Sequence, residues 1–147
     1  CRTAEAHATR QAMRALDTNV LARFFVDDAD DAQAARQRPA AAAAMAERSS
    51  VSVTVVLEFE WVLRGFYDLP TSDVARVLRA LASIPHITLE DRDAVLAAVD
   101  GVDKGLDFAD ALHLARSHHA SSFATFDRRL AKRATALGML PTVDLLE

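Results

Sequence analysis

Four acidic side chains stand where hydrophobic packing does not explain them, and together they could hold a divalent cation. They are Asp17, Glu58, Asp110 and Asp127. Asp17 ends a predicted strand and Asp127 follows another, so both lie where open α/β sheets place their chemistry. Four ionised carboxylates repel one another in a shared crevice unless cations are present. Oxygen ligands without cysteine or clustered histidine favour Mg²⁺ or Mn²⁺ over zinc, and such ions support phosphodiester hydrolysis.

Glu58 interrupts a largely apolar helical stripe. Its neighbours one turn away include Val55 and Trp61, so we expect its carboxylate to project from apolar surroundings. A buried carboxylate is costly unless it is paired or bound to metal. The alternative is a glutamate at the edge of the stripe that reaches water. Glu60 has Arg64 four residues later, which predicts an ordinary surface ion pair.

Asp107 and Asp110 are three residues apart at the start of a predicted helix. A capping pair explains them, because acids suit the positive end of a helix dipole. Asp110 nevertheless has apolar neighbours such as Phe108 and Leu112, so we expect it to take part in chemistry. For Asp107 a cap and a supporting position beside the site are both open. Asp127 would likewise be only a cap if it stood alone.

A basic segment follows Asp127 and contains Arg128, Arg129, Lys132 and Arg133. Cations in the first turns of a helix oppose its dipole, and a nearby anion would offset this. That anion could be the acids themselves or a bound phosphate. A solvated helix face is the other explanation, since three of these residues fall at helical spacing on one side.

Strands alternate with helices along the chain, and this order positions the acids. Strands are predicted at 13–17, 50–53, 86–89, 122–125 and 142–145, the first of them buried. Helices are predicted at 18–25, 29–48, 54–66, from 71, at 91–102, 107–119 and 127–137, with Thr18 and Thr54 as caps. Such alternation implies parallel strands joined by right-handed crossovers. We therefore predict a three-layer α/β/α sandwich with a central parallel sheet of about five short strands.

Composition bounds the class of protein. The chain has 147 residues, a net charge of −4 and a single cysteine, Cys1, which favours one soluble domain in a reducing cytoplasm. The acidic balance argues against broad electrostatic adhesion to nucleic acid. No apolar run is long enough to span a bilayer. Residues 1–12 show no clear period and Met13 precedes the first strand, so we expect an upstream extension followed by one domain at 13–147. A genuine N-terminal arm is the alternative.

Four segments carry a resemblance to a known family. They are Leu-Asp-Thr-Asn-Val-Leu at 16–21, Val-Leu-Glu-Phe-Glu at 56–60, Leu-Asp-Phe-Ala-Asp-Ala-Leu-His-Leu-Ala at 106–115 and Ala-Thr-Phe-Asp at 124–127. In this order they resemble the PIN-domain ribonucleases, in particular the VapC-type toxins of bacterial toxin–antitoxin pairs. The resemblance implies that Asp17, Glu58, Asp110 and Asp127 are catalytic, and that the three aspartates bind metal. It also implies that Asn19 and Thr125 lie next to these ligands and hold them in position. Asp107 could have the same role.

The implied activity is Mg²⁺- or Mn²⁺-dependent endoribonuclease action on a structured RNA, with Arg128, Arg129, Lys132 and Arg133 as candidate RNA contacts. The implied partners are a cognate antitoxin, whose arginine-bearing tail would suit an acidic crevice, and a second copy of the chain that binds through the early helices.

Two other functions fit parts of the same pattern. One is a non-catalytic PIN fold that binds RNA or an antitoxin. The other is a haloacid dehalogenase-type phosphatase with Asp17 as nucleophile, although that class needs a second acid where Asn19 stands. His113 either faces solvent or contributes near the acids.

Overall fold

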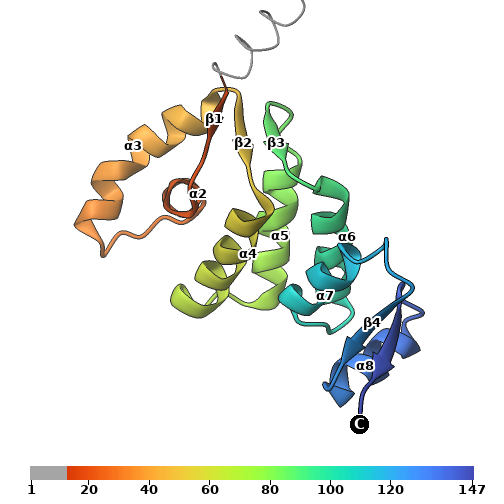
Figure 1. Cartoon of the computed structure of the whole chain (residues 1–147). Coiled ribbons are helices and arrows are strands. Elements are labelled where there is room, and N and C mark those ends of the chain that lie inside the picture. The colour runs from red at the N-terminus through yellow and green to blue at the C-terminus, as the bar shows by residue number, and fades with distance from the viewer. Residues whose placement is uncertain (1–12) are drawn as a thin grey trace, which may run out of the picture. The chain divides into compact units, whose positions relative to one another are not determined.

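The computed structural model describes residues 13–147, which form two compact units, one ending at Arg92 and the other spanning Asp93–Glu147 (Figure 1). The extension expected at 1–12 lies outside the described residues. The fold is mixed α/β and every strand pair is parallel, as predicted. None of the helices in the described part of the chain is both long and apolar enough to cross a membrane.

The first unit contains a small parallel sheet in the order β1-β2-β3. Its strands are β1 (Arg14–Ala15), β2 (Ser49–Val51) and β3 (Ile87–Leu89), and its helices are α2 (Thr18–Phe25), α3 (Ala32–Ala46), α4 (Val53–Trp61), the π-helix η1 (Val62–Phe66) and α5 (Thr71–Ala82). Because the strands are parallel, their carboxyl ends meet at one edge. There Glu90, just after β3, accepts a hydrogen bond from the Val53 amide at 2.9 Å and fixes the start of α4.

The caps of two helices differ from the prediction. Asp17, not Thr18, caps α2, because its Oδ1 accepts a hydrogen bond from the Thr18 amide at 2.8 Å. Ser52, not Thr54, caps α4 by accepting from the Val55 amide at 3.3 Å. Each predicted helix therefore begins at or before the residue that was expected to cap it.

Two further expectations for the first unit need correction. The residues of β1 are exposed rather than buried, and only the following Leu16 is buried. The helix predicted at 54–66 is α-helical only as far as Trp61 and continues as a π-helix.

The second unit places two helices ahead of a second parallel pair of strands. α6 (Arg92–Asp103) starts at the boundary, and α7 (Phe108–Ala115), β4 (Ser122–Thr125), α8 (Arg128–Ala136) and β5 (Thr142–Leu145) follow. The register of β4 and β5 runs from Ser122 opposite Thr142 to Thr125 opposite Leu145. α7 ends at Ala115, earlier than predicted.

The five strands form sheets of three and two among residues 13–147, so each sheet has fewer strands than the predicted central sheet. The strands are only two to four residues long and offer few backbone groups for lateral pairing. Apolar side chains that recur at helical spacing are buried in both units, as expected. Examples are Phe59, Leu63, Leu78, Val95, Phe108 and Leu114.

Glu60, rather than Glu58, is the buried glutamate of α4. The ion pair between Glu60 and Arg64 is confirmed, with Oε1 and Nε 2.8 Å apart, but Glu60 is only 5% exposed. Glu58 is exposed, which agrees with the alternative of a glutamate at the edge of the apolar stripe that reaches water. Glu60 instead shares the buried face of α4 with Val56 and Phe59.

We expect Arg64→Met to lower the free energy of unfolding by about 2 kcal/mol, because the buried Glu60 carboxylate loses its charged partner. Methionine preserves most of the aliphatic stem, so the change isolates the guanidinium. The matched control is Arg76→Met, which removes an exposed pair with Asp73 and should cost no more than about 0.5 kcal/mol. Urea unfolding measures both losses of unfolding free energy. Equal losses for the two variants would show that the buried Glu60 carboxylate does not need a charged partner.

Candidate functional site

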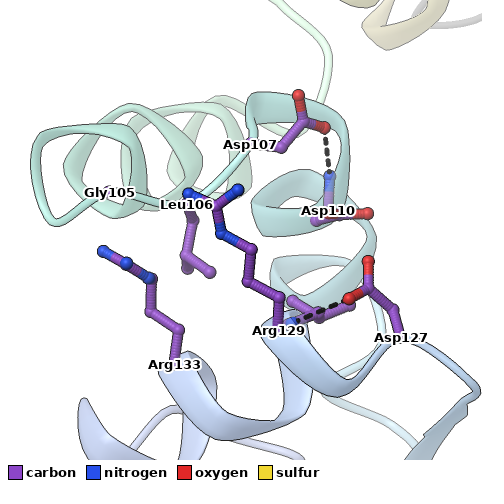
Figure 2. A pocket seen from close by; sticks show the side chains of 8 residues that line it. Gly105, Leu106, Asp107, Asp110, Asp127, Arg129 and Arg133 are labelled. Carbon is purple, nitrogen blue, oxygen red and sulfur yellow. Dashed lines mark hydrogen bonds between the residues drawn. The ribbon is translucent and has the colours of Figure 1, made fainter.

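Three of the acids chosen from the sequence line one pocket of the second unit. Asp107, Asp110 and Asp127 surround a cavity of about 310 Å³ together with Arg129 and Arg133. Figure 2 shows Asp107 and Asp110 on the first turn of α7 and Asp127 at the start of α8. The spacing of the acids in the sequence therefore reflects two helix starts that face the same space.

Two of these acids cap their helices as well as lining the pocket. Asp107 Oδ2 accepts a hydrogen bond from the Asp110 amide at 3.3 Å, and Asp127 Oδ1 accepts from the Leu130 amide at 3.0 Å (Figure 2). Each bond satisfies a backbone donor that the helix itself leaves unpaired. Capping occupies one carboxylate oxygen and fixes the direction of the other. The capping explanation and the functional one are therefore compatible.

The local electrostatics centre on Asp110. Partial burial raises the pKa of the Asp110 carboxyl above its ordinary value, and the negative charges of Asp107 and Asp127 raise it further. His113 acts in the opposite direction and lowers this pKa, so its ring stands near enough to influence the acid. A pocket in which carboxylates oppose one another's ionisation is stabilised by a bound cation.

The chemistry of these donors fits a hard divalent ion. No group of three or more acidic, histidine or cysteine side chains in the described part of the chain is placed so that it could hold a metal ion. Mg²⁺ rarely needs such a group, because it keeps several waters and commonly binds one or two carboxylates plus substrate phosphates. Asp110 and Asp127 are the residues of this unit that would hold it.

The basic residues of α8 divide into two kinds. Arg129 and Arg133 line the acidic pocket, whereas Arg128 and Lys132 do not. Arg128, Arg129 and Lys132 are all exposed, and Arg133 is half-buried. In Figure 2 the Arg129 and Arg133 side chains extend from α8 toward the turn that precedes α7. Neither guanidinium forms an ion pair within 4.0 Å with the pocket acids among the described residues. The pocket thus holds separate positive and negative sides.

Arg133 has a backbone partner, whereas the Arg129 side chain forms no hydrogen bond or ion pair among residues 13–147. Arg133 Nη1 donates to the Lys104 carbonyl at 3.4 Å, and Gly105 beside it has a φ of +93°. A Cβ on Gly105 would collide with the Arg133 guanidinium. Glycine is therefore required here both by the backbone and by the approach of the arginine. Arg129 is the guanidinium best able to bind an external phosphate.

We expect Arg129→Ala to weaken RNA binding on the order of tenfold, because a charge-assisted contact to a phosphate is lost. Arg128→Ala removes the same charge from the adjacent, exposed position outside the pocket and should change the affinity less than about twofold. Fluorescence anisotropy with a labelled RNA in EDTA measures both. Equal losses for the two variants would mean that α8 contributes only general positive charge.

Three of the predicted site residues lie in the first unit. Asp17, Asn19 and Glu58 line a second pocket, at the start of α2 and along α4. The same pocket contains Arg23 and three aromatic side chains. The structure thus brings Asp17 together with Glu58, and Asp110 together with Asp127. That all four carboxylates act at one site stays a prediction.

Thr125 Oγ1 accepts a hydrogen bond from the Asp127 backbone amide at 3.0 Å, so Thr125 contacts the acid that it is expected to support. The sequence-based prediction missed the aromatic residues Trp61, Phe66 and Tyr67, which line the pocket of Asp17. Their grouping depends on the π-helix, and the hydrophobic period of an α-helix gives no signal for it.

Comparison with known proteins gives one family. The family model described as "PIN domain" matches residues 14–136, a range that includes Asp17, Glu58, Asp110 and Asp127. No curated protein and no solved structure matches the chain significantly.

Proposed function

Since the chain belongs to the PIN-domain family, whose members are generally nucleases, we propose that it is a divalent-metal-dependent endoribonuclease. The observation that carries the proposal is the second unit's pocket, where Asp107, Asp110 and Asp127 face Arg129 across one cavity. Phosphodiester hydrolysis needs both elements, namely acids that hold a cation and a positive group that binds phosphate. A pocket for an uncharged ligand would need neither.

Each residue has a role in the proposed reaction. Asp17, Asp110 and Asp127 would hold the metal, which when bound would supply a polarised water and neutralise charge on the phosphate. Asp107 and Thr125 fix the orientation of the neighbouring acids through their bonds to backbone amides. Glu58 accepts a proton from the attacking water, and Arg129 binds a non-bridging phosphate oxygen. Asn19 lines the same pocket as Asp17, and from there it would orient that carboxylate.

The assay that tests this function compares RNA incubated with the protein in Mg²⁺, in Mn²⁺ and in EDTA. We expect cleavage in either metal and none in EDTA. The Asp110→Asn protein, purified in the same way, excludes a contaminating ribonuclease. RNA that is bound but left intact in both metals would identify a non-catalytic binding module. A covalent acyl-phosphate at Asp17 would indicate a phosphatase instead.

The biological setting that we propose is the toxin of a type II toxin–antitoxin pair, acting in the cytoplasm on RNA and forming a homodimer through α2 and α3. The resemblance of four ordered segments to the VapC-type toxins supports this setting. The proposed antitoxin would present arginine to the acidic pocket. Expression of the protein alone should arrest growth, and co-expression of a small antitoxin encoded beside its gene should relieve the arrest. Growth at a normal rate with active protein present would contradict the toxin role.

A further inference from the structure

The end of α4 exposes two large aromatic side chains in one place. Trp61 is 57% exposed and Phe66 is 69% exposed, and the π-helix η1 connects them. A π-helical turn places residues five apart nearly above one another, whereas an α-helix would direct them to different faces. Single exposed apolar residues are ordinary on protein surfaces. Two large ones that line the same pocket indicate a binding surface.

Neighbouring groups hold these rings in position. The Trp61 indole lies against Gly65, where a Cβ would stand 3.2 Å from Cε2. Phe66 contacts Tyr67 edge-on, with ring centroids 4.9 Å apart. Tyr67 in turn accepts a hydrogen bond from Arg23 Nη1 at 3.3 Å. The aromatic surface is therefore built from interlocking contacts within η1 and α2, although its outer faces remain open.

The aromatic surface and two of the predicted catalytic acids share a pocket. Asp17 and Glu58 line it together with Trp61 and Phe66. We propose that Trp61 and Phe66 form a stacking site for an unpaired nucleobase of the RNA, next to the phosphodiester that is cut. This inference rests on the proposed ribonuclease function and adds a requirement on the substrate. The nucleotide beside the cleavage site must be free to leave a duplex.

The chemistry of the pocket favours a nucleotide over an apolar protein segment. Base stacking on an aromatic side chain needs only a π-face and tolerates any base. Proteins that recognise unpaired RNA use such rings beside polar groups that contact the sugar and phosphate. An apolar peptide laid over Trp61 and Phe66 would also approach Asp17 and Glu58, which would lose water without gaining a partner.

Trp61 is the only tryptophan of the chain, so its fluorescence reports on the stacking site alone. The intact protein is titrated in EDTA with an unstructured RNA of about ten nucleotides. We expect saturable quenching of Trp61. An abasic oligonucleotide of equal length and a fully paired duplex carry the same phosphates and should not quench. Absence of quenching by the unstructured RNA, or equal quenching by the abasic strand, would overturn the proposal.

A second experiment repeats the titration with Phe66→Leu. This substitution keeps an apolar side chain but removes the ring, and it leaves Trp61 as the fluorescent reporter. We expect the affinity for the unstructured RNA to fall on the order of tenfold. Leu140→Ala, at an apolar residue that is 78% exposed and outside this pocket, should leave it unchanged. An unaltered RNA affinity for Phe66→Leu would reject the stacking site, and weaker capture of a protein partner by that variant would reassign the surface. EDTA prevents cleavage, so this titration measures RNA binding alone. If the RNA quenches Trp61 but the protein shows no nuclease activity in metal, the proposed function is refuted and the stacking site is not.

Discussion

Replacing Asp17 with asparagine is expected to reduce RNA cleavage by about a thousandfold or more while the protein stays folded, a loss typical of removing a group that acts directly in catalysis. The side chain of Asp17 has two tasks that this substitution separates. Its Oδ1 caps α2 by accepting from the Thr18 amide, and asparagine caps helices as well as aspartate does. The negative charge, by contrast, is lost.

The measurement is the initial rate of RNA cleavage in saturating Mg²⁺, together with the thermal unfolding midpoint of each variant. Asp17→Ala should lose about 1 kcal/mol of stability in addition, because alanine cannot cap the helix. Asp30→Asn is the control, since it removes one exposed charge ahead of α3 and should leave the rate unchanged. A normal rate for metal-saturated Asp17→Asn would remove Asp17 from the catalytic set.

The second large effect is expected at Asp110, and it concerns metal binding and stability together. Wild-type protein should gain about 1.4 kcal/mol, or several degrees in Tm, when Mg²⁺ is present at ten times its dissociation constant. Asp110→Asn should abolish this gain because a ligand of the metal is missing. Without metal the same variant should unfold at a slightly higher temperature than wild type. A neutral amide avoids the cost of partly burying a charged carboxylate at this position, and it also avoids repulsion by Asp107 and Asp127.

The pH dependence follows from the raised pKa of Asp110. A carboxyl whose pKa is higher in the folded state favours folding while it is protonated, and this contribution is lost as pH rises through the folded pKa. The advantage of Asp110→Asn in the absence of metal should therefore grow with rising pH and vanish in acid. Calorimetry at several pH values measures it. A metal-free Asp110→Asn protein less stable than wild type at neutral pH would contradict the proposed repulsion.

Local signals predicted much of the second unit. β4 and β5 occupy the residues expected of them, because each is a short run rich in β-branched or aromatic residues between polar turns. Asp107 and Asp127 cap their helices as the sequence suggested. Such features depend on neighbouring residues alone, so a single sequence is enough to find them.

The environment of α4 could not be predicted in the same way. The stripe beside Glu58 is apolar, yet Trp61 in that stripe is largely exposed, while the charged Glu60 is buried. An apolar pattern indicates where a helix prefers contact, and it does not distinguish a core contact from a binding surface. The π-helix after Trp61 further changes which residues share a face.

The grouping of the acids was only partly accessible. Spacing predicted that Asp107 and Asp110 would be neighbours, and the parallel strands explain why Asp127 follows β4 at a helix start. Gly105 and its contact with Arg133 left no recognisable mark in the sequence. Contacts of that kind depend on side chains that are far apart in the chain and on the precise course of a turn.

The proposed function requires that Asp17 and Asp110 bind the same divalent ion, which is a prediction. The most direct measurement is a titration of the protein with Mn²⁺, in which electron paramagnetic resonance counts the free ion, for wild type, Asp17→Asn and Asp110→Asn. If the account is right, the wild-type protein binds Mn²⁺ and each single substitution weakens that binding at least tenfold. Full binding by Asp17→Asn, with loss only in Asp110→Asn, would confine the ion to the second unit and contradict this prediction.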